Sequence, residues 1–153
     1  MDGDAAAYVA IERLHRAYAD IATRRAWNEV PSIATEDARF CFTRSTGGVF
    51  EVEGAVAFGE FGAQNLGRFT FHLFIPLNFV VSIGTDGSAR GRSYMLEVGE
   101  ERDTGEWVEA YGIYSDEYAC VEGSWLFSRR DYRAYGVRSG GRLQAFPLQF
   151  EPQ

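Results

Sequence analysis

Residues 69–83 read FTFHLFIPLNFVVSI, a stretch so rich in aromatic and β-branched side chains that it predicts one long β-strand. Three stretches of the same character follow it, at 89–100, 107–120 and 125–135. Short turn signals separate them, the first being TDGS at 85–88. Because short turns join antiparallel neighbours, this half of the chain predicts a meander of four long strands.

The half that precedes the meander is largely helical. Within 5–26 the apolar residues recur at three- and four-residue steps, as in an amphipathic helix that is capped near Asp4. Shorter elements are expected at 28–34 (helix), 37–43 (strand), 49–53 (strand) and 54–66 (helix weakened by glycines). Helices followed by strands indicate an α+β fold. A strongly curved antiparallel sheet with helices on one face would then enclose a cone-shaped hydrophobic pocket.

Length and composition limit the classes of function. The chain has 153 residues, 46% of them hydrophobic and 15% aromatic, which suits one domain over 1–153. A net charge of −7 argues against nucleic acid and anionic membranes as partners. All 15 basic residues are arginine, so Schiff-base and P-loop lysines and covalently held pyridoxal phosphate are excluded. The N-terminal residues do not resemble a signal peptide and no apolar stretch is long enough to span a bilayer, so we expect a cytoplasmic protein.

Cysteine and histidine usage predicts no metal or redox site. Cys41 and Cys120 lie in expected strands without C-x-x-C spacing, which favours buried, reduced thiols. The two histidines are far apart and the carboxylates are scattered, so no metal site is predicted.

His72 is the leading candidate for chemistry. It lies inside the most apolar stretch of the chain, where an imidazole loses hydration energy unless it finds a partner or faces a cavity. It is therefore either a core histidine bonded to the backbone or a general acid–base residue in a pocket. His15 lies beside Arg16, off the apolar stripe of the first helix, which predicts a surface position.

The first helix offers two further candidates. Tyr18 lies on the apolar stripe, so its hydroxyl needs either a structural partner or the cavity. Thr23 returns to the same side at the end of the helix. Asp20 instead faces Arg16 and Arg24 at four-residue spacing, which predicts a solvated ion pair.

The third long strand alternates strongly, so Tyr114, Asp116 and Tyr118 share one face. Asp116 is then either a cross-strand partner for an arginine or an acid in the pocket. Arg129 and Arg130 are adjacent in the last strand, so only one of them points inward. There it would meet a carboxylate of the protein or of a substrate.

Several of these residues also carry a family resemblance. The tract LHRAYA at 14–19, followed by Trp27, resembles the first helix of SnoaL-like proteins, and GIYSDEY at 112–118 is similar to a late strand of the same family. On this resemblance, which spans about residues 5–135, the chain is identified as a SnoaL-like, scytalone dehydratase-like member of the nuclear transport factor 2-like superfamily. Its members share the cone-shaped α+β fold.

The resemblance implies acid–base chemistry without a cofactor. In catalytic relatives a histidine at the position of His72 works with an acid near the end of the first helix. Dehydratase and dehydrochlorinase relatives have Asp where this chain has Thr23. Either Asp116 or Glu97 replaces that acid, or the reaction needs only modest proton transfer, or the protein binds a ligand without such a dyad.

The implied activity is that of a dehydratase, isomerase or cyclase of secondary metabolism acting on a small apolar oxygenated molecule. His72 would be the base, Tyr18 and Tyr114 would donate hydrogen bonds to a substrate oxygen, and Thr23 would orient His72. Arg129 would bind a polar end of the substrate or pair with Asp116. The remaining expected pocket residues are Phe42, Phe71, Phe74 and Tyr94. The tail 136–153 would cover the mouth of the cone.

Two other classes of protein stay open. One is a non-catalytic ligand-binding domain of the same fold, and the other is a structural partner similar to the β-subunit of an oxygenase. For the enzyme and for the ligand-binding domain we expect a homodimer or homotrimer, because the convex face of such sheets often packs on a copy.

Overall fold

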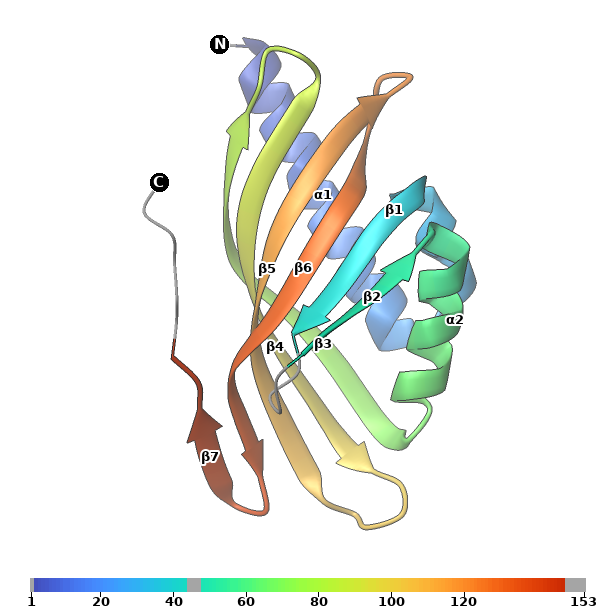
Figure 1. The fold of residues 1–153 in the computed structure, drawn as a ribbon, viewed down its shortest axis with the longest axis vertical. Coiled ribbons are helices and arrows are strands. Elements are labelled where there is room, and N and C mark those ends of the chain that lie inside the picture. Colours follow the sequence, from blue (N-terminus) through green and yellow to red (C-terminus); the bar gives the residue numbers. More distant parts are fainter. Residues whose placement is uncertain (1, 44–47, 148–153) are drawn as a thin grey trace.

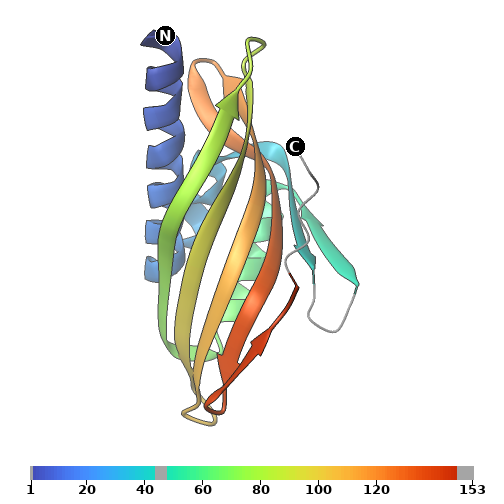
Figure 2. The same cartoon turned by 90° about the vertical axis from the view of Figure 1, so that its left-hand side faces the viewer.

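The computed structural model describes residues 2–43 and 48–147 and shows helices packed on one face of a long, curled sheet (Figures 1 and 2). The elements in chain order are α1 (Asp2–Arg24), the 3-10 helix η1 (Trp27–Ser32), β1 (Ala34–Thr43), β2 (Val49–Glu53), α2 (Ala55–Leu66), β3 (Phe69–Ile83), β4 (Ser88–Glu101), β5 (Trp107–Val121), β6 (Ser124–Ser139) and β7 (Arg142–Ala145). The expected α+β cone is confirmed.

The sheet has the strand order β2-β1-β6-β5-β4-β3. The short strand β7 also pairs with β6 but is not part of this order. The predicted meander is confirmed as β3 to β6, in which each strand is antiparallel to the next. The sheet as a whole is mixed, because β1 runs parallel to β6. The first strand of the chain thus lies beside the last long one, which curls the sheet around the helices but leaves β2 and β3 as separate edges.

The concave face of the sheet forms the core. The apolar stripe of α1 is buried there, with Ile11 fully buried and Leu14, Tyr18, Ile21 and Ala22 each at most 6% exposed. In Figure 2 α1 stands along the face of the sheet that it covers. The buried stripe confirms the predicted amphipathic helix. None of the described helices, in 2–43 and 48–147, is long and apolar enough to cross a membrane.

The boundaries of the helices differ from the expected ones. The first helix begins at Asp2, so Asp4 is not its cap, and it ends at Arg24 because Arg25 has a positive φ of 61°. The second helix is a 3-10 turn. The glycines that weaken the helical signal of α2 permit close packing, since a Cβ on Gly62 would lie 2.6 Å from the Trp27 ring.

The C-terminal segment continues the sheet. Residues 136–139 extend β6, and β7 pairs with them as an exposed edge. The described part of the expected cover, 136–147, lines neither of the hollows described below. The rest of it, 148–153, lies outside the described residues.

Candidate active site

An aromatic hollow of about 430 Å³, including its open mouth, lies between α1, η1, α2 and the concave face of the sheet. The side chains that form its walls are Tyr18, Trp27, Phe42, Phe58, Phe61, Phe74 and Tyr114, joined by Asn65 and Glu97. Glu97 is the only carboxylic acid among the described residues that line it. Its mainly aromatic walls with a few polar groups are typical of a small-molecule site.

Glu97 and His72 form a hydrogen-bonded pair at the edge of this aromatic hollow. Nε2 of His72 lies 2.5 Å from Oε1 of Glu97. The side chain of His72 is 0% exposed, whereas that of Glu97 is 24% exposed. Antiparallel pairing produces this contact, because Phe74 is opposite Glu97 and His72 is the next residue on the same face of β3. Glu97 therefore reaches the aromatic hollow, and His72 lies behind it.

The second ring nitrogen of His72 has no hydrogen-bond partner among the described residues. Nδ1 is buried, and the ring stacks on Phe69 at a centroid separation of 6.0 Å. Nε2 therefore makes the hydrogen bond of this ring. The carboxylate of Glu97, 2.5 Å away, accepts that hydrogen bond from Nε2–H.

Two phenols lie beside Glu97. The hydroxyl groups of Tyr18 and Tyr114 are 3.5 Å apart, and both side chains line the aromatic hollow. Burial raises the pKa of Tyr18 and raises that of Tyr114 well above its ordinary value, against the opposing charge of Arg130. Both phenols therefore stay protonated at neutral pH and can donate hydrogen bonds to a ligand oxygen.

Thr23 is bonded to the backbone of β3. Its hydroxyl accepts a hydrogen bond from the backbone N–H of Phe74 at 3.1 Å. This contact fastens the end of α1 to the strand that carries His72. The carboxylate beside His72 is that of Glu97 on β4, one of the two acids considered as replacements for the family's acid.

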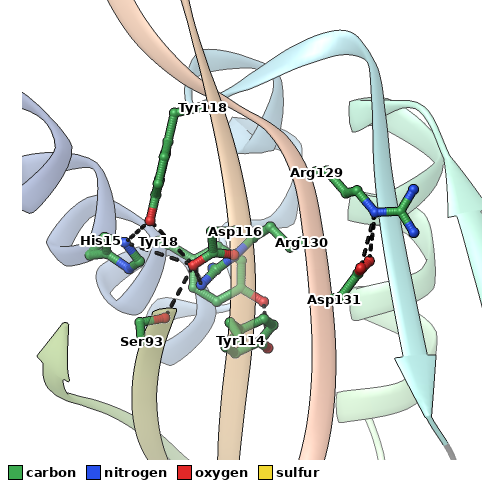
Figure 3. A network of polar contacts seen from close by, with 9 residues as sticks. All are labelled: His15, Tyr18, Ser93, Tyr114, Asp116, Tyr118, Arg129, Arg130 and Asp131. Carbon is green, nitrogen blue, oxygen red and sulfur yellow. Dashed lines mark hydrogen bonds and ion pairs between the residues drawn. The ribbon is translucent and has the colours of Figure 1, made fainter. Parts of the chain in front are cut away.

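A second polar cluster is buried deeper in the cone (Figure 3). Arg130 donates to Asp116 through Nε at 2.8 Å and Nη2 at 3.3 Å, and the two side chains are 2% and 0% exposed. Ser93 donates to the same carboxylate at 3.1 Å. Asp116 is thus a cross-strand partner of an arginine, one of the two roles considered for it, and it does not line the aromatic hollow.

The surface position expected for His15 is wrong. Its residue exposure is 7%, and Nε2 lies 2.6 Å from the hydroxyl of Tyr118, which in turn contacts Asp116. Burial, and then the charge of Arg130, lower the pKa of His15 to about 3. The ring is neutral at neutral pH, so its 3.8 Å separation from Asp116 is not an ion pair there.

The role expected for Arg129 is also wrong, because it points out of the cone. Arg130 is opposite Asp116 in the register of β5 and β6, whereas Arg129 is opposite Glu117 and so faces the other side of the sheet. Arg129 donates to Asp131 at 3.0 Å and contacts Cys41 through Nη2 at 3.4 Å.

Three further expectations concern side-chain placement. Phe71 is 47% exposed and stacks on Trp107, so it is no pocket residue; as the neighbour of His72 it must point to the opposite face. Tyr94 lines a neighbouring hollow beside Arg130 rather than the aromatic hollow. Cys41 is buried as expected, but Cys120 is exposed. Within 2–43 and 48–147 no group of three or more His, Cys, Asp or Glu side chains could hold a metal ion.

Sequence reasoning missed one wall of the aromatic hollow. Trp27 from η1 and Phe58, Phe61 and Asn65 from α2 form it. The signal that could have found three of them is the spacing of Phe58, Phe61 and Asn65, which places them on one face of a helix.

Fold and site together define a cone-shaped α+β domain with a carboxylate–imidazole pair at an aromatic cavity. A family model described as the SnoaL-like domain matches residues 3–131, and the chain belongs to this family. No match is found among curated proteins.

Solved structures share the fold. A candidate scytalone dehydratase from Novosphingobium aromaticivorans is 20% identical with a TM-score of 0.82, covering 99% of each chain. Hexachlorocyclohexane dehydrochlorinase LinA-type3 from Novosphingobium barchaimii is 18% identical with a TM-score of 0.75, covering 100% of each chain. A candidate aromatic ring hydroxylase from N. aromaticivorans is 25% identical with a TM-score of 0.73, covering 86% of this chain and 91% of its own.

Proposed function

We propose that the protein is a cofactor-independent acid–base enzyme of the dehydratase, isomerase or cyclase type that acts on a small apolar oxygenated molecule. One observation carries the proposal: a carboxylate bonded to a buried imidazole at 2.5 Å faces an aromatic hollow that also presents two protonated phenols. The relatives named for dehydration and dehydrochlorination support it, since both names describe eliminations.

The proposed mechanism gives Glu97, not His72, the contact with substrate. The carboxylate removes a proton from a carbon next to a carbonyl group, and Nε2–H of His72 holds the carboxylate in place. The carbonyl oxygen gains negative charge, which the phenols of Tyr18 and Tyr114 stabilise by hydrogen bonds. The proton then returns to another carbon, which isomerises the substrate, or a leaving group departs with its bonding electrons and takes the proton from Glu97, which completes an elimination.

A non-catalytic ligand-binding role is the second candidate. The observation that favours it is the complete burial of the His72 side chain, together with Thr23 in place of the family's acid. In this case the pair would only fix the polarity of the pocket wall. Assembly as a homodimer or homotrimer and a cytoplasmic location stay predictions, the former open to light scattering of the purified chain.

Proton abstraction can be tested without knowing the natural substrate. A panel of cyclic ketones is incubated with the protein in D₂O, and NMR follows deuterium entering the carbon next to the carbonyl. We expect exchange that Glu97→Gln abolishes and that the matched control Glu100→Gln, on the exposed side of β4, leaves unchanged. Ketones that bind but exchange no faster than in buffer would favour the binding role.

A further inference from the structure

A second hollow lies against the first and is lined by the buried arginine. This arginine hollow measures about 300 Å³ including its opening, and its polar lining side chains include His15, Asn78, Ser93 and Arg130. Tyr18, Phe74 and Tyr114 line both hollows, so they form the wall that the two share. A ligand in the aromatic hollow therefore lies next to the arginine hollow.

The arginine hollow borders an irregularity in β3. The pairing of β3 with β4 shifts register between Pro76 and Phe79. Leu77 and Asn78, the residues within the shift, line this hollow, and Leu77 is 51% exposed. Bulges of this kind are common beside binding sites, because they re-aim side chains and interrupt the ladder of hydrogen bonds.

One donor group of Arg130 is not used by Asp116. Its Nε and Nη2 are used by Asp116, whereas Nη1 is buried without a hydrogen-bond partner among the described residues. The guanidinium carbon lies 4.2 Å from the ring centroid of Tyr18, 3.9 Å from Tyr114 and 4.2 Å from Phe127, so rings hold the group in place. A fixed, buried and unused N–H donor favours any acceptor that can reach it.

The charges around Nη1 select the kind of acceptor. The positive charge of Arg130 is already balanced by Asp116 in a buried pair. His15 is neutral, so it adds no positive charge. A carboxylate brought to this place would lose its hydration without an uncompensated cation to replace it, whereas a neutral oxygen would lose far less.

We propose that the arginine hollow is a second subsite of the cavity, in which Arg130 Nη1 donates to a neutral carbonyl or ether oxygen of the ligand. The inference rests on the proposed function, because it names the substrate class of that same cavity. The substrate then carries two oxygen acceptors, one at the phenols of Tyr18 and Tyr114 and one at Arg130. Anionic acids are poor ligands of this subsite.

The test compares four bicyclic probes of similar shape: chromanone with two oxygens, tetralone with one, tetralin with none, and a chroman carboxylate. Titration calorimetry measures their affinities. We expect chromanone to bind at least about tenfold more tightly than tetralone, the ratio for one hydrogen bond to a charged donor, tetralone to bind more tightly than tetralin through the phenols, and the carboxylate to bind more weakly than chromanone. Arg130→Lys should remove most of the preference for chromanone, while the outward-facing control Arg129→Lys should keep it.

A measurement on the unmodified protein covers the case in which Arg130→Lys does not fold. NMR of ¹⁵N-labelled arginine side chains identifies Arg130 by its proximity to the rings of Tyr18, Tyr114 and Phe127. Chromanone should shift this signal and tetralin should not. If chromanone shifts the ring signals of Trp27 but leaves Arg130 unmoved, or binds no better than tetralone, the subsite is refuted and the proposed function stands. If no probe binds, both fail.

Discussion

Asp116 and Arg130 face each other across β5 and β6 as a fully buried ion pair, with Nε of Arg130 2.8 Å from Oδ1 of Asp116. Arg129 forms an ion pair with Asp131 at a similar distance, 3.0 Å, but on the other face of the sheet. Its side chain and that of Asp131 are 34% and 41% exposed. The two arginines are neighbours in sequence, so the two pairs compare a buried and an exposed ion pair.

Asp116→Asn should lower the free energy of unfolding by about 3–5 kcal/mol, because it leaves the charge of Arg130 buried without a counter-charge. Arg129→Gln should lower it by less than about 1 kcal/mol, because water screens the exposed pair. Urea unfolding followed by circular dichroism measures both. Equal losses in the two variants would contradict the burial of the Asp116 pair.

His15 should make stability depend on pH. Its pKa is about 3 in the folded protein, against 6.5 for an ordinary histidine, so the unfolded chain binds the proton more tightly. The stability that the neutral ring contributes is complete above about pH 6.5 and is lost as the pH falls toward 3. Between pH 7.5 and pH 5 the wild-type protein should lose about 2 kcal/mol more than His15→Gln. Parallel curves for the two proteins in urea would rule out a neutral buried His15.

Glu97→Gln and His72→Gln should have different effects on turnover of any substrate found by deuterium exchange. Removing the carboxylate should lower kcat by about 10²–10⁴-fold, the usual contribution of a general base. His72→Gln should cost less, because a glutamine N–H can still donate to Glu97. Steady-state kinetics measures both, and a larger loss with His72→Gln would assign the base role to the histidine instead.

Gly62→Ala should destabilise the protein although alanine favours a helix. The added Cβ would lie 2.6 Å from the Trp27 ring, and such overpacking costs about 1–3 kcal/mol, more than the helical preference of about 1 kcal/mol returns. Gly3→Ala, in the same type of element with nothing within 4 Å, should cause no loss. Thermal unfolding compares the two variants; an unchanged Tm for Gly62→Ala would mean that Trp27 moves freely.

The two thiols should react at very different rates. Cys120 is exposed, whereas Cys41 is buried, and burial with help from Glu51 raises its pKa to about 12. Because the thiolate is the reactive form, a disulfide reagent at pH 8 should modify one thiol per native chain quickly and the second only after unfolding. Cys120→Ser should remove the fast phase. A fast phase of two thiols would contradict the burial of Cys41.

Much of the fold could be predicted because its signals are local. The stretch 69–83 becomes β3 at the predicted residues, and the stripe of α1 is buried as its spacing indicates. The parallel contact of β1 with β6 could not be predicted, since it joins segments about ninety residues apart and no local pattern encodes it.

The candidate site divides in the same way. Sequence alone determined that His72 and Tyr18 are buried titratable side chains, because an apolar neighbourhood in sequence is a local property. Only the tertiary structure decided that Glu97 is the partner of His72, that Arg130 rather than Arg129 faces inward, and that His15 is in the core. These outcomes depend on the register between strands and on the position where a helix crosses the sheet. A shift of one residue in either would reverse which side chains meet.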